Sequence, residues 1–330
     1  MTNVDEHLEA FPFDRPPVVL PRQEELLLSD PLPAARKRYR DQPPLEVVHF
    51  DAEYVERDFA PPRGVYESDF LRVEWQTMNG RQPFYHRNCD VDELSYEVTG
   101  ERTVLTECGS VTMRPGDFTR IPVGRAHDNY GLRDIHVLFY IPAPVIETAV
   151  AHRVSEFLMP PFDGWEPATV NEMITECLGG AGHDIVMAPA DELTLLEQAT
   201  RDTERMAVLR PPPHAPGTTW LYSSSDVLLG RTFAERSAGR VYRRIRNAEE
   251  IHYQLAGTRT LVTQRGVVEL EPGDFVRIPV GIAFTSIHGE PSAHLTLVSA
   301  RPVPQVAPGT RQAERPVLAR LAALRAAVRD

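Results

Sequence analysis

The stretch RPGDFTRIPVGRAH, residues 114–127, has a close counterpart in EPGDFVRIPVGIAF, residues 271–284. Corresponding residues lie 157 positions apart, as Gly116 and Gly273 do, and at this offset the match extends back to Tyr85 without a gap. A match of this length predicts an internal duplication, and therefore two domains of the same fold.

Each copy consists of short segments that alternate polar and apolar residues, separated by turns rich in Gly and Pro. In the first copy, the strand candidates are residues 104–105, 111–113 and 118–121. Many short strands at even spacing are typical of a barrel or jelly roll. The sequence therefore predicts an all-β protein with two tandem barrels.

The rest of the chain is expected to connect these barrels. Residues 189–209 have helical spacing with Asp191 as the N-cap, and residues 314–329 form an amphipathic helix that should pack against a barrel or a neighbouring subunit. The predicted order is an N-terminal arm at 1–62, a first barrel at 63–145, a helical linker at 146–217, a second barrel at 218–302 and a C-terminal helix at 303–330.

The first copy also carries two groups of residues at fixed spacing. They are Gly80, His86, Asn88, Glu93 and Gly100, and then Gly116, Pro122, Gly124 and His127. Both spacings resemble the signature motifs of the cupin superfamily, G-x5-H-x-H-x3–4-E-x6-G and G-x5-P-x-G-x2-H-x3-N. Asn88 stands where that family usually has His, and Gly131 where it usually has Asn. The resemblance implies tandem cupin barrels, that is, a bicupin.

The same residues predict a metal centre in the first barrel. His86 and Asn88 share one face of a strand, and the inward faces of separate strands converge in a closed barrel. We therefore expect His86, Glu93 and His127 to hold one divalent metal. Two imidazoles and one carboxylate favour Fe(II), although Mn, Ni and Zn accept the same ligands. Side chains expected to hydrogen-bond a ligand or to face the substrate are Asn88, Ser95, Arg125 and Asn129.

The second copy lacks both imidazoles of this centre. Its corresponding residues are Arg243, Ile245, Glu250 and Phe284. An Arg and one carboxylate hold a transition metal poorly, so the second barrel is predicted to be free of metal. One alternative stays open, in which Glu250, His252 and His288 form a site of their own, although their spacing matches no known metal pattern.

A narrower resemblance lies within the first motif. The run FYHRNC at residues 84–89, followed by Glu93, is similar to the metal-binding segment of homogentisate 1,2-dioxygenase. That family consists of two-cupin iron enzymes that open a hydroxylated aromatic ring with O2. The resemblance implies that His86, Glu93 and His127 are iron ligands. This chain departs from the family in a His-to-Glu gap one residue longer and in carrying the site in its N-terminal copy.

These observations predict a non-haem Fe(II) dioxygenase that acts on a small, hydroxylated aromatic substrate together with O2. Two other classes remain open: a metal-dependent isomerase, hydrolase or decarboxylase that does not use O2, and a bicupin that binds a small molecule without turning it over. Fold alone does not choose among them, because cupins host many reactions.

Composition narrows the range of partners and compartments. A net charge of −12 argues against nucleic acid or an anionic membrane as partner. The chain has one lysine, Lys37 in the arm, which argues against Schiff-base chemistry. Three cysteines at wide spacing indicate no disulfide framework, and no signal peptide or membrane span is evident. We expect a cytoplasmic protein, and a homo-oligomer because one barrel is redundant.

Overall fold

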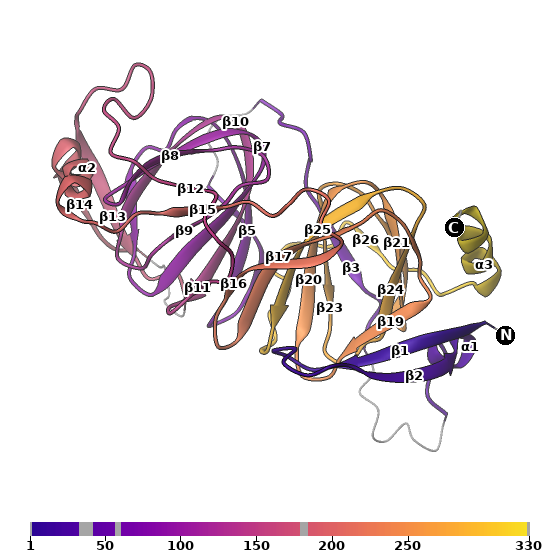
Figure 1. Ribbon diagram of the computed structural model, residues 1–330. Helices are drawn as coiled ribbons and strands as arrows, with labels where there is room; N and C mark the ends of the chain where they lie inside the picture. Colours follow the sequence, from indigo (N-terminus) through magenta and orange to yellow (C-terminus); the bar gives the residue numbers. More distant parts are fainter. Residues whose placement is uncertain (1, 33–41, 57–60, 179–183, 329–330) are drawn as a thin grey trace. The chain divides into compact units, whose positions relative to one another are not determined.

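The computed structural model describes residues 2–32, 42–56, 61–178 and 184–328, so Lys37 lies outside the described residues. The chain forms two compact units. One, containing the first barrel, comprises residues 51–211 and 303–307; the other, containing the second barrel, comprises residues 1–50, 212–302 and 308–330. The predicted fold class is confirmed, because both units are built mainly of strands that close into barrels (Figure 1).

Two very long strands organise the first barrel. Strands β7 (Val91–Thr106) and β10 (Ala126–Pro142) pair along most of their length and carry the other strands on either side. The remaining elements of this unit are β4 (Arg63–Glu67), β5 (Arg72–Arg81), β6 (Tyr85–Asn88), β8 (Gly109–Met113), β9 (Phe118–Ile121), β11 (Ile146–Glu147), β12 (Arg153–Val154), β13 (Thr169–Thr175), β14 (Asp184–Asp191), α2 (Glu192–Arg201) and β15 (Ala207–Leu209).

The second barrel has two sheets, because the counterparts of β7 and β10 are each broken in two. One sheet has the order β2-β1-β19-β24-β21-β22, and the other contains β16-β17-β25-β20-β23-β3-β26. Its elements are β1 (Asn3–Glu9), β2 (Val18–Gln23), α1 (Glu24–Leu27), β3 (Glu46–His49), β16 (Gly217–Ser223), β17 (Val227–Ala234), β18 (Ser237–Ala238), β19 (Val241–Ile245), β20 (Glu249–Ala256), β21 (Arg259–Thr263), β22 (Gly266–Leu270), β23 (Asp274–Ile278), β24 (Phe284–His288), β25 (Ser292–Ser299), β26 (Arg311–Gln312) and α3 (Leu318–Ala327).

The repeated Pro-Gly-Asp sequence forms the same turn in both barrels. Gly116 and Gly273 have φ values of 95° and 97°, a conformation that residues with a side chain rarely adopt. The following carboxylate closes the turn. Asp117 accepts a hydrogen bond from the backbone N–H of Arg114 at 3.0 Å, and Asp274 accepts one from the backbone N–H of Glu271 at 2.8 Å. This shared turn explains why the motif survives in both copies.

The predicted helices are present but shorter than expected. Asp191 caps α2, as its side chain accepts a hydrogen bond from the N–H of Thr194 at 2.8 Å. The helix ends at Arg201 instead of residue 209, because Met206 and Val208 enter a hydrophobic cluster of the first barrel and residues 207–209 pair as β15 with β9. The C-terminal helix α3 packs on the second barrel. No helix in the described ranges is long and apolar enough to cross a bilayer.

Each barrel is flanked by a strand–strand–helix arm, and the two arms are alike. Strand β13 runs parallel to β6 and pairs with β14, which leads into α2 (Figure 1). Strand β1 runs parallel to β19 and pairs with β2, which leads into α1. The arm in the predicted linker thus belongs to the first barrel, and the N-terminal arm belongs to the second.

Equivalent contacts fasten the two arms. Tyr85 donates a hydrogen bond to Glu192, the first residue of α2, and Tyr242 donates one to Glu24, the first residue of α1. Arg87 forms an ion pair with Glu172 of β13 at 2.6 Å. Its counterpart Arg244 forms one with Glu6 of β1, also at 2.6 Å. The sequence holds a faint trace of this second repeat, since PADELTLL at residues 189–196 matches PRQEELLL at residues 21–28.

The buried turn carboxylate yields a first prediction. Asp117 has no exposed surface and also binds Arg153 and, at 2.7 Å, Arg210. Replacing it in Asp117→Ala should lower the free energy of unfolding by about 2 kcal/mol, because a turn N–H loses its acceptor and two guanidinium groups lose their partner. Urea denaturation measures this value. Asp163→Ala, an exposed loop substitution, is the control. Equal midpoints for the two variants would contradict the assignment.

Candidate metal centre

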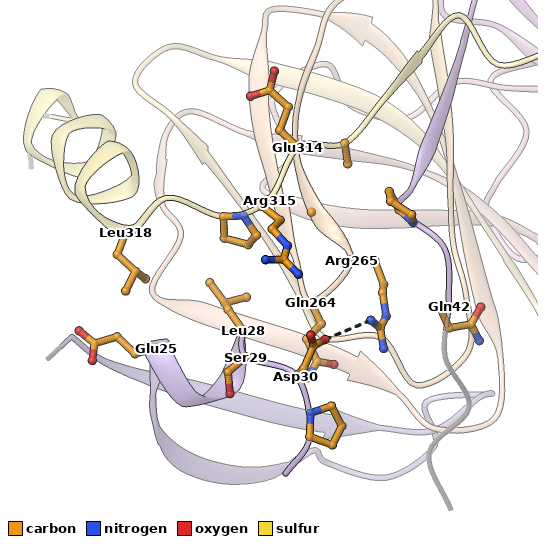
Figure 2. Close-up of a pocket in the computed structure, with 15 residues that line it drawn as sticks. Glu25, Leu28, Ser29, Asp30, Gln42, Gln264, Arg265, Glu314, Arg315 and Leu318 are labelled. Carbon is orange, nitrogen blue, oxygen red and sulfur yellow. Dashed lines mark ion pairs between the residues drawn. The ribbon is translucent and has the colours of Figure 1, made fainter. Parts of the chain in front are cut away.

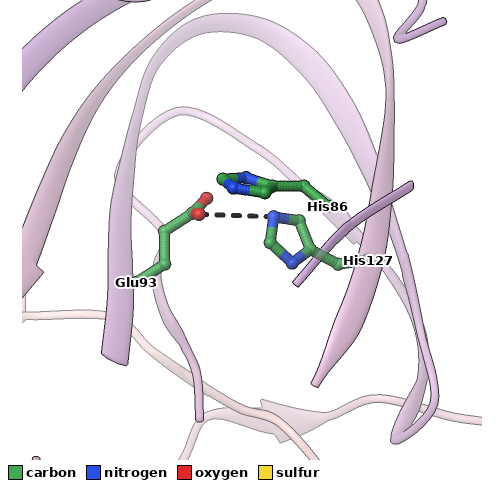
Figure 3. Close-up of side chains that lie close together, drawn as sticks. All are labelled: His86, Glu93 and His127. Atoms are coloured by element: carbon green, nitrogen blue, oxygen red, sulfur yellow. Dashed lines mark ion pairs between the residues drawn. The ribbon is translucent and has the colours of Figure 1, made fainter. Parts of the chain in front are cut away.

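Three side chains from three strands converge inside the first barrel. His86 lies on β6, Glu93 on β7 and His127 on β10, and all three point toward one another (Figure 3). One potential ligand atom from each lies within 4.8 Å of the others. Cross-strand pairing of His127 with His86 sets the two imidazoles side by side. The predicted ligands are therefore brought together in a cluster of the size that one ion requires.

Charges within this cluster shift the pKa values of its members. Burial would raise the pKa of Glu93, but His127, His86 and Asn88 stabilise the carboxylate and lower the pKa to about 2. His127 is also buried, yet the Glu93 carboxylate 3.2 Å from its Nε2 raises its pKa. Burial and the neighbouring imidazole lower the pKa of His86 to about 4. Glu93 therefore stays ionised and His86 neutral at neutral pH, the states in which they bind metal.

Asn88 contacts a candidate ligand. Its Nδ2 donates a hydrogen bond to Glu93 Oε2 at 3.0 Å, while its Oδ1 accepts from the thiol of Cys177 at 2.8 Å. The amide oxygen therefore already has a donor, and the amide nitrogen cannot act as a ligand. Asn88 therefore orients the carboxylate of Glu93 and is not itself a metal ligand.

Two of the other predicted pocket residues, Ser95 and Asn129, contact a buried guanidinium. Arg102 donates to Ser95 Oγ at 2.7 Å and contacts Asn129 Oδ1 at 3.4 Å. Arg125 is placed elsewhere: its side chain pairs with Asp202 at 2.8 Å and with Glu204. Only its backbone carbonyl oxygen reaches the site, 3.4 Å from His127 Nδ1, where it can accept the ring proton and leave Nε2 for a metal.

Strand register reveals interior residues that sequence reasoning missed. Tyr140 lies opposite Glu93 on the neighbouring strand, and Arg72 lies opposite Tyr140, so all three face the interior. Glu74, two residues along from Arg72, shares that face. Burial raises the pKa of Glu74 to about 7, with Arg72 opposing and Glu93 adding to the rise. Glu74 can therefore hold or release a proton near neutral pH. Glu74 belongs to no motif, so only strand register could have identified it.

The second barrel fills the equivalent position with its own cation. Arg243 pairs across the strands with Phe284, as His86 does with His127, and its guanidinium lies 5.5 Å from the centre of the Phe284 ring. The same guanidinium contacts Glu250 at 3.4 Å. His252 Nε2 lies 2.6 Å from Glu250 Oε1. His288 instead bonds the backbone of Glu290, so the alternative site of Glu250, His252 and His288 is not assembled.

One further group of side chains could hold a metal by distance alone: His49, Glu271 and Asp274. Its chemistry is that of an ion pair. Asp274 is the turn carboxylate of the second barrel and binds His49 at 2.8 Å together with Arg311. The equivalent carboxylate of the first barrel binds two arginines. His49 therefore takes the place of an arginine, and a neighbouring guanidinium already neutralises the carboxylate.

A surface cavity of about 720 Å³ lies in the unit of the second barrel (Figure 2). Asp30 and Arg265 form an ion pair of 3.8 Å in its wall, and Arg315 and Leu318 also line it. Its wall carries charges of both signs. Neither of the two metal-ligating groups found among the described residues lies in it.

Comparisons with solved structures give likenesses at low sequence identity. No protein-family model matches the chain, and no curated protein matches its sequence. A cupin 2 conserved barrel domain protein from Leptotrichia buccalis is 8% identical with a TM-score of 0.46, over 74% of this chain and 92% of that one. A point mutant of Bacillus subtilis oxalate decarboxylase is 15% identical with a TM-score of 0.46, over 91% and 89%. At these values, neither likeness bears on the reaction of this chain.

Metal content tests the centre directly. We expect one divalent ion per chain in protein purified without chelators, and loss of that ion in His86→Ala and His127→Ala, because each change removes one of three ligands. His214→Ala, which removes an exposed imidazole of the other unit, should retain the ion. Elemental analysis gives the stoichiometry. Equal metal content in all four proteins would show that the ion binds elsewhere.

Acid should destabilise the second barrel through His252. Burial lowers the pKa of His252 to about 4, so below pH 6.5 the unfolded chain takes up a proton that the folded chain does not. Stability should therefore fall between pH 6.5 and 4, by up to about 3 kcal/mol from this group. Urea denaturation across this range should show a shallower fall in His252→Gln. Parallel curves for the two proteins would contradict a buried neutral imidazole.

Proposed function

We propose that the first barrel is a mononuclear metal-dependent enzyme, and that it uses Fe(II) and O2 to oxidise a small, hydroxylated aromatic substrate. The observation that supports this is the ligand set itself: two imidazoles and one carboxylate, with Asn88 turned aside at the usual fourth position. Such a set leaves coordination positions open for a substrate and O2. We also propose that the protein is a homo-oligomer. Helix α3 gives this no support, because its apolar side packs against its own barrel.

His86, Glu93 and His127 would hold the ion, which when bound acts as a Lewis acid and as a template for an oxygen-donor substrate. The carbonyl oxygen of Arg125 orients the His127 ring, and Asn88 Nδ2 fixes the carboxylate of Glu93. These contacts fix the orientation of the two side chains, so that each presents its lone pair to the ion in one direction.

The interior face next to the ligands offers a proton acceptor. A phenol that binds a metal loses its hydroxyl proton, and a carboxylate with a pKa near 7 can accept that proton at neutral pH. Glu74 has this property and lies on the same interior face as Glu93. We assign it the role of general base; Leu138 lies opposite it on the neighbouring strand, and a hydrogen bond from the Tyr140 side chain stabilises its carboxylate.

The FYHRNC run supports this substrate class less than its length suggests. Tyr85 and Arg87 face away from the metal ligands and fasten the arm. Tyr242 and Arg244 make equivalent contacts in the barrel that lacks counterparts of both histidines. Two of the shared residues therefore serve the scaffold. The likeness to homogentisate 1,2-dioxygenase rests on His86, Asn88 and Glu93, which define a centre rather than a substrate.

Metal-dependent chemistry without O2 is a second candidate, because Glu74 favours it equally. A decarboxylase or an isomerase needs a group that delivers or removes a proton at neutral pH, and a carboxyl with a pKa of about 7 does so. Activity that persists under strict anaerobiosis would identify this class.

Oxygen consumption distinguishes the two candidates. The iron-loaded protein should take up O2 with at least one member of a panel of hydroxylated aromatic acids, and His127→Ala should not. Products formed without O2 uptake would shift the function to the second candidate. Stabilisation by a panel member with no product by mass spectrometry would leave a small-molecule-binding bicupin.

Glu74→Gln tests the proposed base. Because the amide cannot accept a proton, kcat should fall by roughly 100-fold, and the rise in activity through about pH 7 should disappear. The pH profile of kcat, measured on variants with equal metal content, gives the result. Glu166→Gln, which removes an exposed carboxyl of the same unit, is the control. A wild-type profile in Glu74→Gln would exclude this role.

A further inference from the structure

The arm of the first barrel delivers a polar side chain directly to the metal ligands. Parallel pairing of β13 with β6 sets Met173 opposite His86 and Thr175 opposite Asn88. Thr175 is 3% exposed, and its Oγ1 lies within hydrogen-bonding distance of His86 Nε2 and 3.3 Å from Asn88 Oδ1. The hydroxyl thus contacts both His86 and Asn88.

Residues just after β13 hold this position. Asp90 accepts hydrogen bonds from the backbone N–H groups of Cys177 and Leu178, at 2.8 Å and 2.7 Å. The Cys177 thiol then reaches Asn88 Oδ1 at 2.8 Å. Since Asn88 Nδ2 donates to Glu93, its Oδ1 is the acceptor for both the thiol and the Thr175 hydroxyl. Two donors from the arm therefore fix the amide that orients Glu93.

The second barrel shows the same arrangement with different chemistry. Its arm strand β1 runs parallel to β19 and sets Glu9 opposite Ile245, the position equivalent to Asn88. Glu9 Oε2 accepts hydrogen bonds from Arg243 at 2.9 Å and 3.0 Å, and Arg243 is the counterpart of His86. In both barrels, then, the arm residue at this register binds the side chain at the position of the first motif histidine.

We propose that Thr175 is a positioning residue of the metal centre, with Cys177 as its support, so that the centre is completed by the arm and not by the barrel alone. This inference rests on the proposed metal site. Because the Thr175 hydroxyl donates its one proton to Asn88 Oδ1, its oxygen accepts from the N–H at His86 Nε2, which holds the ring and leaves Nδ1 for the ion. An ordinary contact between strands would stabilise the arm without acting on the ion.

Cobalt(II) is the probe, because its visible absorption reports the geometry and symmetry of its ligands. Four chelator-treated full-length proteins are loaded with Co(II): the wild type, Thr175→Val, Thr175→Ser and Thr169→Val. Thr175→Val removes the hydroxyl and keeps the shape, whereas Thr175→Ser restores the hydroxyl. Thr169 is exposed at the far end of the same strand and gives the matched control. Spectra, Co(II) dissociation constants and thermal unfolding midpoints are recorded for each.

We expect Thr175→Val to shift the Co(II) absorption bands and to weaken Co(II) binding by about tenfold, within the range found when groups behind metal ligands are removed. Thr175→Ser should resemble the wild type, and Thr169→Val should be unchanged. A lower unfolding midpoint with an unaltered spectrum and dissociation constant would overturn the inference, since it shows a structural role only. Failure of the wild type to bind Co(II) would overturn the metal centre itself, a distinct outcome.

Discussion

A carboxylate that has lost nearly all contact with water occupies the same interior position in both barrels. Glu93 and Glu250 are 3% and 1% exposed. Burying an unpaired carboxylate costs several kcal/mol, so each barrel must supply positive charge or hydrogen-bond donors beside it. The first barrel meets this requirement with His127 and the Asn88 amide, in an arrangement that can also hold an ion. The other contacts of the candidate centre depend on this arrangement around Glu93.

The second barrel meets the same requirement without a metal. The guanidinium of Arg243 and the ring of His252 contact Glu250 and help to lower its pKa to about 2 against the effect of burial. Arg259 Nη2 lies 2.9 Å from His252 Nδ1, so that nitrogen accepts and Nε2 carries the proton directed at Glu250. A metal ion at this position would share one carboxylate with a guanidinium that is always charged, so we expect none to bind beside Glu250.

The sequence was sufficient to predict the barrels and the convergence of His86, Glu93 and His127, because both depend on local rules. The Pro-Gly-Asp turn needs a glycine with positive φ, and alternation along a strand sends His86 and Asn88 to one face. The sequence could not predict contacts that depend on the register between distant strands. Thr175, for example, contacts His86 although the two lie 89 positions apart. Arg125 was misplaced for a related reason. Alternation applies only within a strand, and β10 begins at Ala126, so the Arg125 side chain leaves from the preceding turn.

Comparison of the two barrels separates scaffold from chemistry, because the second is a version of the first without the ligands. Three features that both retain serve the fold: the Asp117 turn, the tyrosine that binds the arm helix, and the arm itself. Glu74 does not belong to that set. Its counterpart by register is Arg231, which lies opposite Leu295 as Glu74 lies opposite Leu138. A carboxyl near the ligands of one barrel, replaced by a guanidinium where the ligands are gone, is therefore not required by the fold. Thr175 stands in the same relation to Glu9, so we group both residues with the proposed centre.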